Sequence, residues 1–171
     1  MFISNCEAIS VKLKYIVFLS MGVTGKLEVE VDIKCHGDLF HELFGKKPHH
    51  LPNITPDKVH ICNAHEGDFG KPGSVISWDY TLDGKKCVAK EIVEAIDEEN
   101  KSVRFKIIEG DLLKEFKCLT ISVHVIPRGE ETAVKWLAEF EKIADDGPYP
   151  TKIMDFCISI TKDIEDHHLK A

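Results

Sequence analysis

Residues 26–35 alternate apolar with polar side chains, a pattern with a period of two. The apolar positions are Leu27, Val29, Val31 and Ile33. Because successive side chains of a strand point to opposite faces, this alternation predicts a half-buried strand. Residues 36–45 change to helical spacing, and Gly45 is a stop signal for that helix. Three prolines within residues 46–56 leave room only for a short helix or turns.

Six more strands are predicted in succession, at residues 57–67, 74–82, 85–96, 101–110, 117–127 and 132–143. Asp83–Gly84 is a strong signal for a tight hairpin turn, and residues 97–100 and 128–131 are further turns. Strands that follow one another through hairpins pair antiparallel. Each strand should keep its apolar positions on one side: Val59 and Ile61; Ile76, Trp78, Tyr80 and Leu82; Val103, Phe105 and Ile107; Leu119, Ile121, Val123 and Val125; Val134, Trp136, Ala138 and Phe140.

The pattern becomes helical from Pro150, a residue type that suits the first turn of a helix, to the end of the chain. A sheet with one apolar face needs a cover, and this helix can supply it. The pattern therefore predicts an α+β domain in which an antiparallel sheet packs against a long C-terminal helix. The apolar stripe of the helix consists of Ile153, Met154, Cys157, Ile158, Ile160, Thr161, Ile164 and His168.

The composition fits a single soluble domain. The chain has 171 residues, of which 43% are hydrophobic and 30% charged. Its net charge of −7 works against nucleic acid as the main partner. We interpret residues 1–20 as an extension outside a domain that covers residues 21–171. Its apolar run is broken by Lys12 and Lys14, so it is too short for a membrane span, although residues 10–18 could still pair as an edge strand.

The six cysteines are spread along the chain without any Cys-x-x-Cys pair. Most of them lie in apolar segments, which favours reduced, buried thiols in a cytoplasmic protein. The nine histidines show no metal-binding spacing, so we expect no metal site and no cofactor.

The glycine-rich stretch at residues 65–73 invites comparison with a phosphate-binding loop. Gly67, Gly70 and Gly73 are spaced by three, which fits neither the Walker spacing nor the dinucleotide-binding spacing. A strand follows it, so no helix N-terminus is available for a phosphate. We interpret the stretch as a turn that uses positive backbone angles, and Phe69 within it could serve as a lid or as an anchor.

Several stretches together resemble the plant major latex protein family of the Bet v I (birch pollen allergen) superfamily. These are residues 65–80, 83–117, 134–142 and 160–168, and the resemblance covers residues 21–171. It implies a helix-grip fold, in which a seven-stranded antiparallel sheet wraps a long C-terminal helix and two short helices follow strand one. It also implies a hydrophobic cavity that binds small hydrophobic or amphipathic molecules, and a link to plant defence and stress responses.

From the residues alone, the space between sheet and helix could be a packed core; the resemblance favours a cavity. The entrance of this cavity should be bordered by the short helices near residues 40–44 and by a rim loop that contains Gly67, Phe69, Gly70 and Gly73. We expect a monomer whose partner is the small molecule. The residues expected to line the cavity are Phe40, Leu43, Ile76, Trp78, Tyr80, Val103, Phe105, Leu119, Ile121, Met154 and Ile158.

Two catalytic alternatives remain open. Lys135 stands four residues before Glu139–Phe140, as the catalytic lysine does in norcoclaurine synthase of the same superfamily, but the alternation puts it opposite the apolar face. A desolvated lysine could act as a base. Ribonuclease activity, ascribed to relatives, would need an acid and a base such as Glu109 and a histidine beside a cation such as Lys71.

Overall fold

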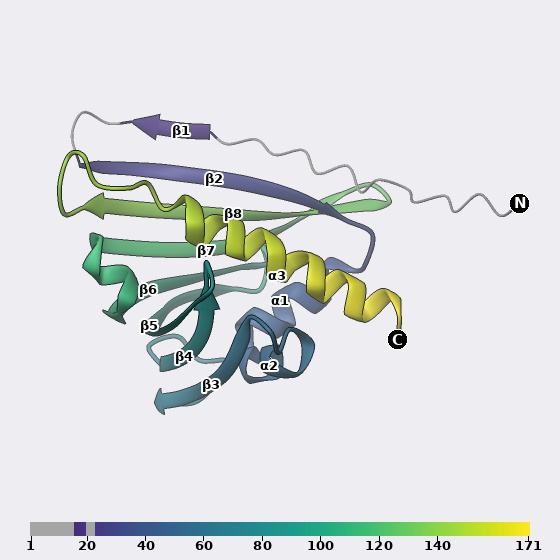
Figure 1. Ribbon diagram of the computed structural model, residues 1–171. Coiled ribbons are helices and arrows are strands. Elements are labelled where there is room, and N and C mark those ends of the chain that lie inside the picture. Colours follow the sequence, from purple (N-terminus) through teal and green to yellow (C-terminus); the bar gives the residue numbers. More distant parts are fainter. Residues whose placement is uncertain (1–15, 20–22) are drawn as a thin grey trace, which may run out of the picture.

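The computed structural model describes residues 16–19 and 23–171, and residues 16–19 only in their backbone (Figure 1). The strands are β1 (Ile16–Leu19), β2 (Thr24–Ile33), β3 (Val59–Glu66), β4 (Val75–Leu82), β5 (Lys85–Asp97), β6 (Ser102–Gly110), β7 (Phe116–Arg128) and β8 (Glu131–Lys142). The α-helices are α1 (Gly37–Gly45), α2 (Leu51–Ile54) and α3 (Thr151–Leu169). Two single-turn helices, η1 (Pro48–His50) and η2 (Asp111–Lys114), complete the described elements.

The strands form one antiparallel sheet in the order β1-β2-β8-β7-β6-β5-β4-β3. Helix α3 runs across its concave face, and α1 and α2 lie near the C-terminal half of α3 (Figure 1). The predicted α+β helix-grip fold is thereby confirmed, with β2 to β8 as its seven strands. Strand β1 pairs antiparallel with β2 and adds an edge strand to this set, while the rest of the predicted extension lies outside the described residues.

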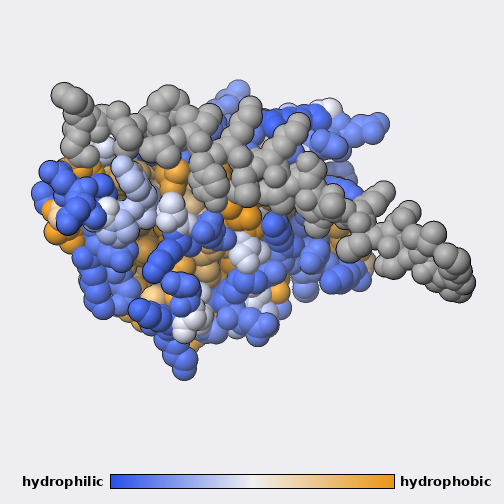
Figure 2. Space-filling view, turned by 45° about the horizontal axis from the view of Figure 1, so that its top comes forward, coloured by the Kyte–Doolittle hydropathy of each residue, from blue (hydrophilic) through white to orange (hydrophobic). Residues whose placement is uncertain are grey.

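The alternation along the chain determines which face of the sheet is buried. On β8, Val134, Trp136 and Ala138 are at most 3% exposed, whereas the intervening Lys135 is only half-buried. Apolar side chains from β2, β6 and β7 line the same face as the buried positions of β8. Hydrophilic side chains cover much of the outward surface seen in Figure 2, with hydrophobic patches between them.

One strand departs from its predicted pattern. Val59 and Ile61 were expected on one side of β3, but Val59 is 2% exposed and Ile61 is 45% exposed. The pairing with β4 shifts its register between these two residues. An irregularity of this kind inserts or removes a position from the alternation, so the residues beyond it change faces. Cys62, rather than Ile61, is therefore the next buried side chain.

Polar contacts fasten the C-terminal half of α3 to the rest of the domain. The Thr55 hydroxyl donates to Asp163 over 2.7 Å, and the Lys58 ammonium donates to the same carboxylate oxygen over 2.5 Å. The buried Glu165 accepts from the backbone N–H of Lys34 over 2.5 Å. These contacts join α3 to the segment after α2 and to the end of β2, so they hold the helix against the sheet.

Candidate functional site

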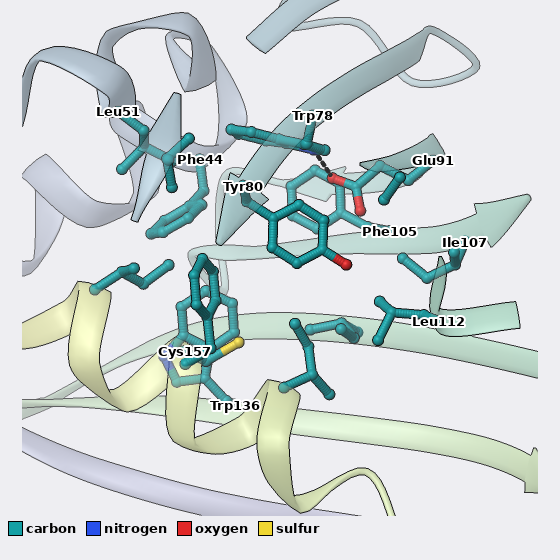
Figure 3. Close-up of a pocket in the computed structure, with 16 residues that line it drawn as sticks. Phe44, Leu51, Trp78, Tyr80, Glu91, Phe105, Ile107, Leu112, Trp136 and Cys157 are labelled. Carbon is teal, nitrogen blue, oxygen red and sulfur yellow. Dashed lines mark hydrogen bonds between the residues drawn. The ribbon is translucent and has the colours of Figure 1, made fainter. Parts of the chain in front are cut away.

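A cavity of about 90 Å³, partly open to solvent, lies between the sheet and α3. The close-up in Figure 3 shows its side chains converging from the sheet, from α1 and from α3. Nearly all of them are apolar, so the space suits a hydrophobic guest. The lining residues are Phe44, Leu51, Val59, Trp78, Tyr80, Ala89, Glu91, Phe105, Ile107, Leu112, Ile121, Trp136, Ile153, Phe156, Cys157 and Ile160.

Glu91 is the one carboxyl group in this lining, and it is 8% exposed. The indole N–H of Trp78 donates a hydrogen bond to its Oε1 over 2.5 Å, drawn as a dashed line in Figure 3. Burial disfavours the charged form and raises the pKa of Glu91 to about 7, although the hydrogen bond from Trp78 opposes this shift. Near neutral pH the cavity therefore contains a carboxyl group that is partly protonated.

Tyr80 brings a second polar group to the cavity wall. Its side chain is 5% exposed, and its hydroxyl has no hydrogen-bond partner among the described residues. Figure 3 shows this hydroxyl pointing to the side where Ile107 and Leu112 lie. Burial raises the pKa of Tyr80, so the phenol stays protonated and can both donate and accept. An unsatisfied buried hydroxyl is costly, and a bound molecule could satisfy it.

The opposite wall of the cavity is rigidly built. The Trp136 indole N–H donates to the Thr161 hydroxyl over 2.9 Å, and that hydroxyl donates to the Cys157 carbonyl over 2.7 Å. The ring of Phe44 meets Trp136 edge-on at 5.1 Å between centroids. This chain of contacts ties β8 to α3 and α1, so we expect this wall to keep its shape when a guest enters.

Trp78 and Phe156 are the two half-buried side chains of the lining, while the others are buried. Trp78 comes from β4 and Phe156 from α3. The cavity is thus nearest to solvent in the gap between β4 and the N-terminal half of α3. Phe156 also contacts the ring of Tyr80, at 5.5 Å between centroids.

The structure brings four of the eleven residues expected in the cavity together in its lining: Trp78, Tyr80, Phe105 and Ile121. Six others are buried in the hydrophobic core without bordering the cavity: Phe40, Ile76, Val103, Leu119, Met154 and Ile158. They face inward, but their neighbours fill the space in front of them. Leu43 is buried too, and it borders a separate, more polar groove together with His50, His167 and His168.

The glycine-rich turn packs beside the end of α1 and does not border the cavity. Gly67, Gly70 and Gly73 all have positive φ, between 74° and 87°, as expected for such a turn. The Phe69 ring stacks on His49 at 4.4 Å between centroids. The N–H of Gly73 donates to the Val93 carbonyl over 2.7 Å. Phe69 is therefore an anchor in this structure, because its ring is held against η1.

Lys135 lies on the outer face of the sheet and does not border the cavity. Its ammonium is 2.9 Å from the Glu28 carboxylate of the neighbouring strand. The residues considered for ribonuclease chemistry are also engaged elsewhere. Lys71 pairs with Asp68 over 2.9 Å, and Glu109 pairs with Lys90 over 3.1 Å.

The sequence pattern did not predict Glu91 as a residue of the cavity lining. Within residues 85–96 both faces of the strand carry apolar side chains, with Val88 and Ile92 on one face and Ala89 and Val93 on the other. The alternation therefore does not say which face is inward. The pairing of Trp78 with Ala89 was the available signal, because a two-residue turn at Asp83–Gly84 fixes that register.

Within residues 23–171, no group of three or more histidine, cysteine, aspartate or glutamate side chains is arranged to hold a metal ion. No helix in the described part of the chain is long and apolar enough to cross a membrane. The five described cysteines, which exclude Cys6, are free thiols.

Comparison with known proteins shows the family to which this chain belongs. The model of the pathogenesis-related protein Bet v 1 family matches residues 22–171. MLP-like protein 31 of Arabidopsis thaliana is 43% identical over 152 residues, which cover 88% of this chain and 89% of that protein. MLP-like protein 43 of the same plant is 43% identical over 149 residues, covering 86% of this chain and 94% of that protein. The chain belongs to the Bet v 1 family, within its major latex protein group.

Solved structures agree with this assignment. The crystal structure of ginseng major latex-like protein 151 from Panax ginseng is 53% identical and superposes with a TM-score of 0.85, covering 86% of this chain and 99% of that one. Norcoclaurine synthase from Thalictrum flavum, in complex with dopamine and hydroxybenzaldehyde, is 18% identical with a TM-score of 0.65, covering 90% of this chain and 98% of that one. The second likeness shows a shared fold alone.

Proposed function

We propose that the protein binds a small hydrophobic or amphipathic molecule in the cavity between the sheet and α3, and that it carries or senses this molecule in the cytoplasm. The observation that supports the proposal most directly is the cavity itself, whose lining is almost entirely apolar. Transfer of apolar ligand surface from water into such a space is favourable by about 25 cal/mol per Å², before the cost of ordering the ligand is subtracted. The pathogenesis-related family supports a link to plant defence and stress responses.

The size of the cavity limits what enters without rearrangement. About 90 Å³ is well below the roughly 300–1,000 Å³ of typical ligand pockets. A molecule larger than a single ring therefore requires side chains of the lining to move. Trp78 and Phe156 are the candidates, because both are only half-buried at the gap between β4 and α3. The Trp136 wall, with its buried hydrogen bond to Thr161, is expected to stay in place.

Two measurements test this proposal. Native mass spectrometry of protein purified from its natural source should reveal a co-purifying small molecule of low polarity. Titration with an apolar dye that fluoresces in dry surroundings should show saturable binding with one site per chain. A protein that carries no small molecule and binds no such dye would contradict the proposed function.

A further inference from the structure

Glu91 and Tyr80 are two polar groups that border an otherwise largely apolar cavity. Glu91 receives one hydrogen bond, from Trp78, on Oε1. Its other oxygen turns in Figure 3 to the side of the cavity where the Tyr80 hydroxyl lies. That hydroxyl has no partner in the described part of the chain. Buried polar groups normally have their hydrogen bonds made, so the unpaired Tyr80 hydroxyl, on the side to which this oxygen of Glu91 turns, indicates a role toward a guest.

The surroundings of Glu91 contain no positive charge that would pair with it. The groups that interact with its charge are Trp78 and Tyr80 of β4, Cys62 of β3 and Cys157 of α3. No lysine, arginine or histidine borders the cavity among the described residues. The indole can only donate, and each of the other three groups would become negative if it ionised. A second negative charge in the cavity is consequently unfavourable.

Resting on the proposed function, we propose that this cavity selects ring-sized molecules that present an uncharged or positively charged N–H or O–H donor to Glu91, and that it rejects carboxylates of the same size. Glu91 is the specificity-determining residue of the site. Tyr80 contributes a second polar contact to the head group of the guest. The apolar lining binds the remainder of the molecule and contributes affinity without chemical selectivity.

The selection follows from ordinary hydrogen-bond chemistry. An ionised carboxylate only accepts hydrogen bonds, so an amine or alcohol head group satisfies its free oxygen. A charged hydrogen bond in a site without water is stronger than a neutral one. A molecule with an ammonium head group should therefore bind most tightly. A carboxylate guest would place like charges together in a medium of low dielectric constant, which is unfavourable.

The test compares four molecules that share one ring and differ in the head group. These are benzylamine, benzyl alcohol, toluene and benzoate, titrated by calorimetry or NMR at pH 8, above the pKa of Glu91 of about 7. Benzylamine should bind about tenfold or more tightly than toluene, benzyl alcohol should fall between them, and benzoate should bind most weakly. Glu91→Gln should reduce the advantage of benzylamine by about tenfold and improve the binding of benzoate.

Two further variants make the result specific. Glu109→Gln removes the same charge from an exposed position on β6, and it should leave all four affinities within about twofold of the native values. Tyr80→Phe retains the carboxyl group, so the preference for benzylamine over benzoate should survive in it. This variant keeps the test decisive if Glu91→Gln fails to fold, because loss of the preference in Tyr80→Phe would overturn the role of Glu91.

The possible failures can be told apart. If toluene binds but benzylamine gains nothing over it, or if Glu91→Gln and Glu109→Gln act alike, the assignment of Glu91 is overturned and the binding cavity stands. If none of the four molecules binds native protein although the apolar dye does, the proposed selectivity is overturned and the binding function stands. If the dye fails to bind as well, the proposed function itself fails.

Discussion

The ammonium group of Lys135 lies 2.9 Å from the Glu28 carboxylate, on the face of the sheet opposite the cavity. This pair joins β8 to β2 next to solvent. The side chains of both residues are less than a third exposed, so the pair contributes to packing as well as to charge balance.

Replacing Lys135 by alanine should therefore leave ligand binding unchanged. We expect dye affinity within about twofold of the native protein and a loss of about 1 kcal/mol of unfolding free energy. Dye titration and urea unfolding measure the two quantities. Lys26→Ala is the matched control, because Lys26 also pairs with a carboxylate, Glu139, on this outer face. A large loss of binding in Lys135→Ala alone would contradict this placement.

Filling the cavity should abolish binding while the fold survives. Ile121 borders the cavity and is 7% exposed, so Ile121→Trp places a larger ring in the space a guest would occupy. Overpacking of this kind costs about 1–3 kcal/mol. Loss of dye binding with a native circular dichroism spectrum is expected. Val88→Trp adds the same side chain at a position 53% exposed and should bind dye normally. Normal binding by Ile121→Trp would show that the dye occupies another site.

Stability should fall as the pH rises from about 4.5 to about 7, because of Glu91. Its pKa is raised from 4.5 to about 7, so the native state holds this proton more tightly than the unfolded chain. The resulting stabilisation is complete below about pH 4.5 and is lost as the pH passes about 7, a difference of about 3 kcal/mol.

Glu91→Gln should remove this component of the pH dependence, and it should make the protein more stable than native at pH 8. Urea unfolding at a series of pH values measures the effect. Glu109→Gln, exposed and paired with Lys90, is expected to retain the native profile. If Glu91→Gln and native protein show parallel profiles, Glu91 does not titrate as described.

The hydrogen bond from Trp78 lowers the pKa of Glu91, although burial raises it more strongly. Trp78→Phe should therefore raise that pKa above about 7, which can be followed by carbon NMR of the labelled carboxyl group. Trp136→Phe is the control: it also loses a buried indole N–H, but one that donates to Thr161. An unchanged pKa in Trp78→Phe would mean that another group supports the carboxylate.

Phe69→Ala should destabilise the glycine-rich turn without changing dye affinity. The Phe69 ring packs on His49 and does not border the cavity, so its loss removes an anchor. Phe156→Ala should behave in the opposite way and change dye affinity or the rate of entry, since Phe156 borders the cavity at its half-buried side. Weaker dye binding in Phe69→Ala would assign the turn a direct role as a lid.

The alternation of side chains was sufficient to predict the sheet, its antiparallel pairing and the helix that covers it. Each strand from 101 to 143 buries the apolar set of alternate residues expected for it, and Thr120, Ala133 and Lys142 of the other set are buried as well. The prediction failed at Ile61 because a register shift is a property of strand pairing and leaves no clear mark in the alternation.

The cavity was harder to predict than the fold. Inward orientation is a matter of periodicity, but a void depends on how completely neighbouring side chains fill the space. Leu119 and Met154 face inward and are fully buried, yet packing closes the space in front of them, while Ile121 borders the cavity. To place Glu91 in the lining, one needs the register of β5 against β4. The two-residue turn at Asp83–Gly84 determines that register, whereas the apolar pattern of β5 does not.

The alkylation rate of Cys157 should report how often the cavity opens. Its thiol is buried in α3 at the wall of the cavity, and burial raises its pKa, so the reactive thiolate is scarce in the folded protein. Alkylation of this sulfur must then wait for a fluctuation that admits the reagent. The labelling rate of Cys157, followed by mass spectrometry of its peptide, therefore reports how often the protein opens, and occupancy by a tightly held guest should slow it.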